Sequence, residues 1–397
     1  MSLRRDYANI GILALCEAIF MTTSLVNYSI AGIVAAQLLS DATYATLPLA
    51  MIPVVSMVLA LPASFVMKSI GRRRGFVIGA TAGIASAGLC ALALQIASFP
   101  LFVVGIAMTG IYQAFATYYR FAVADHADDR LRGQAVALVL AGGLLAAFIG
   151  PTMANATREM FTPVIFVGSY VATMMINMLA VLLLMFLRLP QKGQIAPRPQ
   201  NRRSPIDLSP IFADPRVVLA MLFCGGANAI MMLVMTATPL AMAGCGFDLS
   251  ASGLVISWHV AAMFAPFLIS GSITRYFGTE RTMILGLLLM GCSGLVAMSG
   301  ISFAHFALAL SLSGLAWNLM YVGGSTLLAS VNDEENRALI QGANEFFGFA
   351  MTALGTFSTG LLFASHGWGH IAALSTAVCV GLYLLFALLR TERKRLI

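Results

Sequence analysis

Charged residues are scarce in this 397-residue sequence, where Asp, Glu, Lys and Arg together make up 10% of the chain. Soluble domains carry about 25% charged residues, so the composition argues against a water-soluble protein. Mean hydropathy is +0.89 and 59% of the residues are hydrophobic, which indicates a chain surrounded by lipid. The alternation of apolar and polar residues that a membrane β-barrel needs is also lacking.

Motifs for metal, disulfide and nucleotide chemistry are lacking as well. The six cysteines are scattered without CxxC or Cys/His spacing, so neither a disulfide framework nor a metal site is predicted. The sequence has no Walker A motif, so ATP is not the expected energy source. A membrane-embedded enzyme would need a metal-binding His/Glu motif or a Ser/Lys or Asp/Asp pair at midplane depth, and none is visible. We therefore expect neither a cofactor nor an enzymatic activity.

The sequence contains long apolar stretches. Each is long enough to cross a hydrocarbon core of about 30 Å as a helix. They predict an all-α membrane protein with twelve transmembrane helices. The predicted spans are residues 8–31, 44–67, 75–95, 99–123, 133–155, 163–187, 216–242, 251–273, 282–300, 303–328, 338–364 and 369–389.

The net charge of +7 is explained by membrane topology and does not indicate a nucleic-acid partner. Of the 23 Lys and Arg residues, all but Arg120 and Arg158 lie at the termini or in and beside the connections that follow even-numbered spans. Basic residues are enriched on the cytoplasmic side of membrane proteins, so both termini are predicted to be cytoplasmic. The first span shows no cleavage site. We expect a multi-pass protein of the cytoplasmic (inner) membrane.

A Pro-rich, basic segment, residues 188–215, divides the chain into two six-span halves, residues 1–187 and 216–397. Its composition favours an extended cytoplasmic linker. The two halves repeat weakly, because five residues of equivalent connections recur: Gly71, Arg74, Gly79, Arg130 and Gln134 match Gly278, Arg281, Gly286, Arg337 and Gln341. Such a repeat predicts two like-oriented bundles related by an axis along the membrane normal.

The connection after the second span resembles a signature of the major facilitator superfamily. The superfamily pattern G-x-x-x-D-R-x-G-R-R corresponds here to SFVMKSIGRR, in which Gly71, Arg72 and Arg73 match. Lys68 replaces the expected Asp, so the acid-centred gating contact of the superfamily is not expected in its usual form.

The fifth span resembles a second signature of the same superfamily. The pattern G-x-x-x-G-P-x-x-G-G corresponds to AAFIGPTMAN, in which Gly150 and Pro151 match. This pattern is associated with antiporters that export drugs and metabolites. The combination YYRFAVAD…LAGGLLAAFIGP also resembles a bacterial subgroup associated with riboflavin uptake. The resemblance covers the whole chain and implies a transporter with two six-helix halves.

Four ionisable residues inside the predicted spans are candidates for a functional role: Glu17, Arg120, His259 and Glu345. Charges within lipid cost several kcal/mol, so such residues usually face a bundle interior or a water-filled cavity. Glu17 and Glu345 are the predicted proton-coupling acids, because burial favours the protonated form of a carboxyl group. The alternative for each is a structural acid that is hydrogen-bonded internally.

Arg120 and His259 each have two interpretations. Arg120 contacts substrate or a gate, with Glu17 as a candidate partner across the cavity, or it extends to the interface and pairs with Asp125. His259 lines the cavity or only hydrogen-bonds between helices. Further cavity residues are expected from helical spacing and position within the spans: Tyr28, Gln113, Asn228, Trp317, Asn318, Tyr321 and Gln341.

A gate is predicted on the cytoplasmic side, where Arg72 and Arg73 can pair with Asp125 and Asp128 of the connection after the fourth span. Exposed pairs contribute only about 0–1 kcal/mol each, but alternation between two states needs only small biases. Gly150 and Pro151 of the fifth span are assigned to the same gating machinery.

These features predict a secondary active transporter that moves a small organic solute by alternating access, with protons as the coupling ion. We expect a monomer whose other partner is membrane lipid. The alternatives are an uncoupled facilitator, a riboflavin-like vitamin importer in place of a drug or metabolite exporter, and a transporter-like sensor. The aromatic and amide residues suit a planar, polar or anionic substrate.

The charge distribution makes a testable prediction about topology. Single cysteines introduced as Gln200→Cys and Arg395→Cys should react with a membrane-impermeant thiol reagent only from the cytoplasmic side, because both positions lie in basic segments. Labelling of intact cells and of inverted vesicles separates the two sides. Reaction of either cysteine in intact cells would contradict the predicted orientation.

Overall fold

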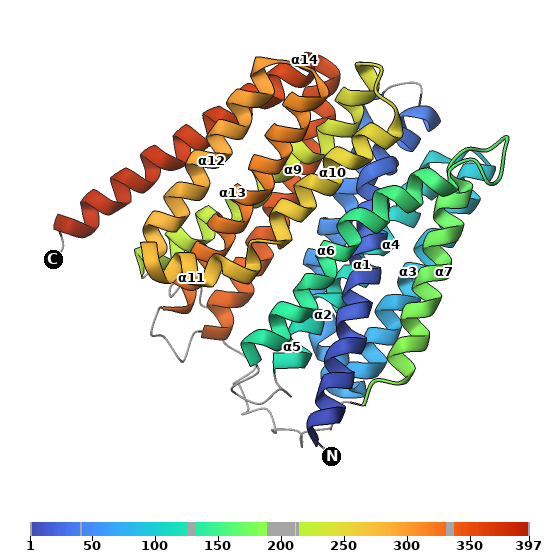
Figure 1. The fold of residues 1–397 in the computed structure, drawn as a ribbon, viewed down its shortest axis with the longest axis horizontal. Coiled ribbons are helices and arrows are strands. Elements are labelled where there is room, and N and C mark those ends of the chain that lie inside the picture. The colour runs from blue at the N-terminus through green and yellow to red at the C-terminus, as the bar shows by residue number, and fades with distance from the viewer. Residues whose placement is uncertain are drawn as a thin grey trace, which may run out of the picture.

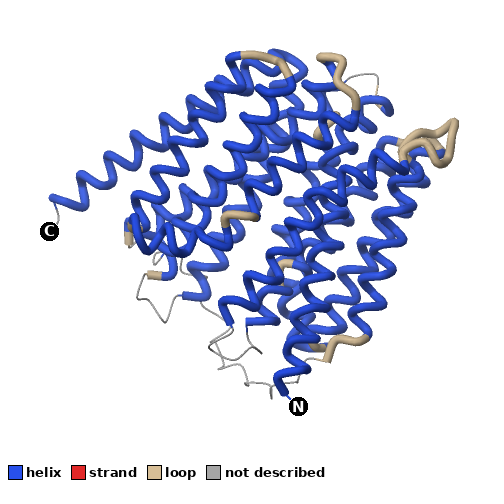
Figure 2. Tube along the Cα trace, viewed as in Figure 1, coloured by secondary structure: helices blue, strands red, loops and turns tan. Residues whose placement is uncertain are grey.

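The computed structural model describes residues 2–39, 42–124, 132–188, 211, 214–330 and 337–395. Within these ranges the chain forms α-helices and one short 3-10 helix, with no strand (Figure 2). A helix satisfies its backbone hydrogen bonds internally, as lipid requires. Ten helical stretches are long and apolar enough to cross a membrane, and a shorter apolar helix covers Leu249–Phe264.

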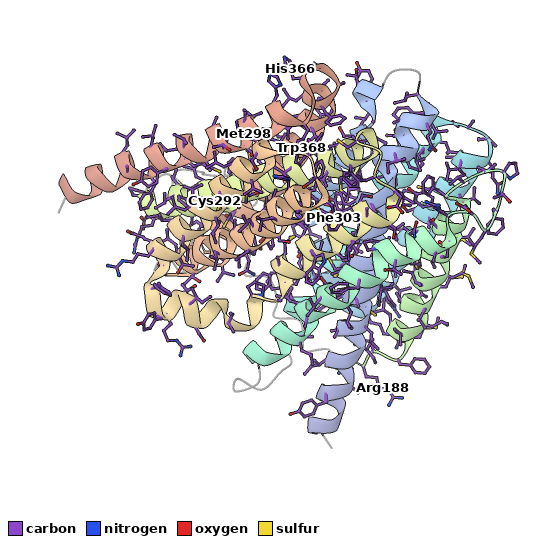
Figure 3. All side chains as sticks on the ribbon, turned by 45° about the horizontal axis from the view of Figure 1, so that its top comes forward. Arg188, Cys292, Met298, Phe303, His366 and Trp368 are labelled. Carbon is purple, nitrogen blue, oxygen red and sulfur yellow. The ribbon has the colours of Figure 1, made fainter. Side chains whose placement is uncertain are left out.

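Six spans precede residue 189. They are α1 (Ser2–Leu38), α2 (Leu47–Ile70), α3 (Arg72–Gln95), α4 (Phe99–Ala116) continued by α5 (Tyr119–Ala124), α6 (Arg132–Thr157) and α7 (Val167–Met185), with η1 (Ala42–Tyr44) before α2. Asn9 of α1 exchanges two hydrogen bonds, of 3.0 and 3.1 Å, with the backbone of Arg188. The start of α1 and the end of the sixth span therefore lie together. We call this the terminal end of the bundle and the opposite one the far end (Figures 1 and 3).

Six further spans follow residue 214. They are α9 (Pro215–Gly244), α10 (Leu249–Phe264) continued by α11 (Phe267–Phe277), α12 (Thr279–Ser299), α13 (Phe303–Ala329) and the two parts of α14 (Arg337–Arg395). Gly367, with φ 71° and ψ −170°, interrupts α14. The buried Trp368 follows it, and its Nε1 donates to the carbonyl of Ala297 at 2.9 Å. Figure 3 shows His366 and Trp368 at the far end, where the last two spans meet.

The twelve predicted spans are confirmed, because α14 contains two of them and α10 with α11 makes one more. The boundaries differ in three places. Helix α1 continues to Leu38 instead of ending at residue 31, and the fourth and eighth spans are broken after Ala116 and Phe264. Pro266 accounts for the second break, because proline has no N–H group and its ring collides with the preceding turn of a helix.

The internal repeat is visible in the backbone. Gly71 precedes α3 with φ 92° and ψ 149°, and Gly278 precedes α12 with φ 83° and ψ 154°. Residues with a side chain rarely adopt these angles, so the same turn requires glycine at equivalent places in the two halves. This repeat and the helix order confirm the architecture of two six-helix halves. Most of the predicted linker, residues 188–215, lies outside the described residues, and its boundaries stay a prediction.

The two halves pack against each other toward the far end. Gly253 of α10 lies against Pro151 of α6, and Gly360 of α14 lies against Thr46 just before α2. Toward the terminal end the halves separate, and α5 and α11 lie apart in Figures 1 and 3. Helix α11 packs on α12 and α13 of its own half. Small residues let the two backbones approach closely toward the far end.

Buried polar side chains connect helices inside each half. In the first half, Asn27 Nδ2 donates to Thr109 Oγ1 at 3.0 Å, Thr109 is hydrogen-bonded to Ser86 at 2.9 Å, and Ser86 donates to the carbonyl of Gly105 at 2.7 Å. These bonds join α1, α4 and α3. Because apolar burial provides little drive for association between helices in lipid, such contacts help to fix the arrangement of the bundle.

The repeated turn generates a prediction about stability. Gly278→Ala should destabilise the protein by about 1–3 kcal/mol, because alanine is strained at a φ of 83°. No atom lies within 4 Å of the place where the new methyl group would stand, so a steric clash would not explain the loss. The midpoint of thermal unfolding in detergent measures the effect. Gly11→Ala is the matched control in a regular helix with equal space, and an equal loss in both variants would contradict the prediction.

Candidate functional site

Arg120 lies on α5, just beyond the break in the fourth span. Thr117 Oγ1 donates to the carbonyl of Gln113 at 2.8 Å, and the Tyr118 hydroxyl donates to the carbonyl of Ala60 at 3.0 Å. Bonds from threonine to the preceding turn bend helices, and the tyrosine fixes the bend against α2. The break sets the direction of α5, which carries Arg120 toward α14 of the other half.

Arg120 forms an ion pair between the two halves. Its Nη2 lies 3.6 Å from Glu345 Oε1, near the start of α14, and the side chains are 23% and 40% exposed. The guanidinium also lies 4.9 Å from the centroid of the Phe121 ring. A pair that is this long and this exposed is a weak contact. It can break and re-form without a large penalty, in contrast to the packed contacts at the far end.

Two aromatic rings lie beside this ion pair. Trp317 and Tyr321 of α13 are stacked, with ring centroids 5.0 Å apart and an interplanar angle of 12°. The Tyr321 hydroxyl lies near Arg120 and interacts with its charge. Phe267, the first residue of α11, approaches Trp317 edge-on at 6.3 Å. The stack is half-buried and therefore has surface left for a flat, apolar face.

Asn228 connects this aromatic stack to two other helices. Its Oδ1 accepts a 2.7 Å hydrogen bond from Trp317 Nε1, and its Nδ2 lies 3.5 Å from the carbonyl of Gly348. Helices α9, α13 and α14 meet at this point. Five predicted residues are thus connected by an ion pair, a hydrogen bond, a ring stack and the electrostatic interaction of Tyr321 with Arg120. We call them the interhalf site: Arg120, Asn228, Trp317, Tyr321 and Glu345.

Glu17 lies near this site but does not join its contacts. It is 6% exposed on α1. Within the described residues it has no hydrogen bond or ion pair, and it interacts with Arg120 only through the longer-range field. The geometry does not place Glu17 and Arg120 in direct contact. A buried carboxyl group without a partner is favoured in its protonated form.

Two predicted cavity residues of the first half make contacts away from the ion pair. Gln113 Oε1 accepts a 2.8 Å hydrogen bond from Ser56 of α2. Tyr28 is half-buried and packs between a core cluster of the first half and one formed mainly by the second. The side chain of Gln341 lies outside the described residues. The roles of these residues toward a substrate stay predictions.

His259 and Asn318 are fully buried and hold α10 to α13. His259 Nδ1 donates to the carbonyl of Leu310 at 2.7 Å, and Asn318 Nδ2 donates to the carbonyl of Met263 at 2.9 Å. These bonds favour the interhelical alternative for His259. Asn318 lies next to Trp317 in sequence but is directed between the helices.

The predicted gating residues lie at both ends of the bundle. Arg72 and Arg73 begin α3 at the terminal end, while Asp125 and Asp128 lie outside the described residues, so the predicted ion pairs are not tested. Pro151 lies against Gly253 of the other half, near the far end, and Gly150 lies against Leu25 of α1. These two contacts place the fifth-span motif in the packed region between helices.

Sequence reasoning did not include Phe267, Ser56 or the pairing of Arg120 with Glu345. Pro266 is a signal that could have revealed the break and hence the position of Phe267. No sequence signal identifies Glu345 as the partner, since helical spacing gives the face of a side chain but not the helix that it meets.

Twelve spans in two repeated halves, with a charged and aromatic site shared between the halves, define a multi-pass membrane transporter. The chain belongs to the Major Facilitator Superfamily, whose sequence model matches residues 13–276 and 231–396. Transporters of this superfamily are not enzymes in general, and membership implies a small-molecule substrate and a chain embedded in the membrane.

Individual proteins similar to this chain agree with that assignment. The riboflavin transporter RfnT of Brucella anthropi is 33% identical over 386 residues, which cover 97% of this chain and 96% of RfnT. The uncharacterised MFS-type transporter YdeG of Bacillus subtilis is 26% identical, covering 86% of this chain and 82% of YdeG. The crystal structure of the human organic anion transporter MFSD10 (TETRAN) has a TM-score of 0.70 at 14% identity, over 96% of this chain and 99% of that one, and shows the shared fold.

The interhalf ion pair makes a prediction that a double-mutant cycle can test. Arg120→Gln and Glu345→Gln should each lower the midpoint of thermal unfolding, because each leaves one charge without its partner, and the double variant should recover part of the loss. The expected coupling energy is about 0.5–1 kcal/mol, since the pair is partly solvated.

A cycle on the exposed neighbouring pair Arg158 and Glu159, whose atoms lie 2.9 Å apart, is the control. It should give a coupling energy near zero. Strictly additive losses at Arg120 and Glu345 would contradict the prediction.

Proposed function

We propose that this protein is a secondary transporter that moves a small organic solute across the cytoplasmic membrane by alternating access. The observation that carries the proposal is the weak ion pair between Arg120 and Glu345, which joins the halves at the point where their packed interface ends. Close packing at the far end and separation at the terminal end correspond to one of the two states that alternating access requires.

The orientation in the proposal follows from the basic residues. With both termini in the cytoplasm, the far end faces outward and the terminal end faces inward. The arrangement in Figure 1 is then the inward-facing state. In the outward-facing state, the terminal ends approach each other and contacts such as that of Gly253 with Pro151 separate.

Riboflavin is the first substrate to test. The relative RfnT, 33% identical over nearly its whole length, is named as a riboflavin transporter. The interhalf site supports the same chemistry, because the stacked rings of Trp317 and Tyr321 can pack on a planar ring system. Arg120 and Asn228 supply a fixed cation and an amide for polar edges of the substrate.

Protons are the proposed coupling ion. Protonation of Glu345 would remove the charge that attracts Arg120, so proton binding and release would bias the equilibrium between the two states. Glu17 is the second candidate, because it is buried without a direct partner in the described part of the chain. An uncoupled facilitator would need neither acid to titrate, and an exporter would use the same site in the opposite direction.

Uptake of labelled riboflavin into proteoliposomes tests the substrate. We expect saturable, time-dependent uptake that excess unlabelled riboflavin abolishes. Trp317→Ala should weaken the apparent affinity about 10-fold or more, because loss of a stacking face on a flat ring contributes about 1–3 kcal/mol in comparable aromatic sites. Phe65→Ala, on the exposed surface of α2, is the matched control. If other solutes are taken up and riboflavin does not compete with them, the protein is a transporter but riboflavin is not its substrate.

The coupling proposal has its own test. A proton gradient directed into the proteoliposomes should drive accumulation of the transported substrate above its equilibrium concentration when they contain the parent protein. Glu17→Gln and Glu345→Gln are compared with Glu159→Gln, which removes an exposed acid outside the spans. We expect accumulation to be lost in at least one of the first two variants, while exchange of internal for external substrate continues. Full accumulation in both would reject proton coupling through these acids.

A further inference from the structure

The eighth span is broken at the level where contact between the halves ends. Helix α10 ends at Phe264 and α11 begins at Phe267, with Ala265 and Pro266 between them. The ring of Phe264 lies against Gly143 of α6 in the other half. The break therefore follows directly after a residue by which α10 contacts the first half.

On the N-terminal side of the break, α10 is hydrogen-bonded to α13. His259 and Asn318 provide the two hydrogen bonds to backbone carbonyls described above, at 2.7 and 2.9 Å. At Gly314 the backbone of α13 approaches the carbonyl of His259 so closely that a side chain would not fit. Met263, whose carbonyl accepts the bond from Asn318, lies in the last turn of α10, where helical carbonyls lack partners of their own. Asn318 thus fixes the end of α10.

On the C-terminal side of the break, α11 packs beside α12 and α13. Its first residue, Phe267, contacts both α10 and α13: its ring centroid lies 6.0 Å from that of Phe264 and 6.3 Å from that of Trp317. Edge-on and tilted aromatic contacts allow the rings to shift relative to each other with little loss of interaction energy. Helix α11 can therefore change direction at the break while α10 stays in place.

Trp317 and Asn318 connect this break to the interhalf site. Trp317 belongs to the site through its hydrogen bond to Asn228 and its stack on Tyr321. The next residue, Asn318, holds the last turn of α10, while Trp317 itself contacts the first residue of α11. A displacement of α13 at Trp317 would therefore move both the last turn of α10 and the first residue of α11.

Asn318 also retains unused hydrogen-bonding capacity. Its side chain is fully buried, and its Oδ1 has no hydrogen-bond partner. A buried acceptor without a donor is destabilising by about 1–3 kcal/mol. The unpaired Oδ1 atom of Asn318 therefore needs an explanation. A helix leaves its first N–H groups without partners in the preceding turn; in α11 the Ile269 N–H donates to the carbonyl of Pro266, and Phe267 is the first residue beyond the break.

We propose that Asn318 is a positioning residue for transport, which holds the pivot of a hinge at Ala265–Pro266. In this state Asn318 Nδ2 fixes the carbonyl of Met263 and α11 is directed away from the first half. When the terminal end closes, α11 turns about the pivot toward α5, and Asn318 Oδ1 accepts an N–H of the first turn of α11. The eighth span therefore bends during transport, in addition to any rigid rotation of the halves. The assignment of Asn318 to transport rests on the proposed function, whereas the hinge itself is tested without substrate.

The test measures a distance within one half, across the break. Spin labels are attached at Leu254→Cys on α10 and Tyr276→Cys on α11, both exposed positions, after replacement of the exposed Cys245 and Cys292 by serine. Asn318→Ala should shift the mean distance between the labels by at least about 2 Å, or broaden the distribution by as much, because the pivot is released. Asn318→Leu keeps a similar volume and removes the Nδ2 donor, and serves if the alanine variant does not fold.

The control removes the other bond between the same helices. His259→Leu should leave the distance between positions 254 and 276 unchanged, because His259 lies more than one turn before the end of α10, whereas Asn318 holds the last turn itself. Equal distributions in the parent and the Asn318 variants, or an equal shift in His259→Leu, would overturn the hinge. The measurement needs no substrate, so it remains decisive even if riboflavin is not transported.

Transport kinetics then distinguish a positioning residue from a purely structural one. With a transported substrate, Asn318→Ala should lower the maximal rate severalfold while the half-saturating concentration changes little, because closure slows and the binding groups stay. Trp317→Ala should chiefly raise the half-saturating concentration. An Asn318 variant that changes only the half-saturating concentration would assign Asn318 to substrate binding and overturn its role as a positioning residue.

Discussion

Within the hydrocarbon core of a bilayer no water is present to satisfy a polar group, and this constraint organises the whole protein. The backbone meets it by forming helices, and most buried side chains meet it by bonding to a neighbouring helix. Asn27 bonds to Thr109, His259 to the carbonyl of Leu310, and Asn318 to that of Met263. Against this background, the partly exposed pair of Arg120 and Glu345 is distinctive. Its charges are tolerated because they meet each other where the halves are no longer closely packed.

The two kinds of contact between the halves differ in strength and in place. At the far end, Pro151 and Gly253 bring backbones together, and such packing is lost only when the halves move apart. Nearer the terminal end, a 3.6 Å ion pair joins the halves through two long, partly solvated side chains. A molecule held together in this way can favour one arrangement without being locked in it. Alternation between states requires that property of a transporter.

The internal symmetry is broken where function is concentrated. Gly71 and Gly278 form the same turn in both halves, yet α2 stays one continuous helix despite Pro53 and Pro62, whereas its counterpart is divided into α10 and α11. The fourth span is also broken, just before Arg120. Discontinuous spans are a common feature of binding sites in transporters. Each half thus contributes one break and, beside it, one residue that lies at or against the interhalf site.

The sequence by itself determined the twelve spans, the two repeated halves and the set of intramembrane polar residues, because hydropathy and glycine-dependent turns are local properties. It also placed Asn228, Trp317 and Tyr321 among the candidates. Only the tertiary structure decided that Arg120 meets Glu345, that Glu17 stands apart, and that Asn318 is directed into a helix break. Helical periodicity fixes which face a side chain occupies. The partner on that face belongs to another helix, far away in the chain, and depends on how the whole bundle packs.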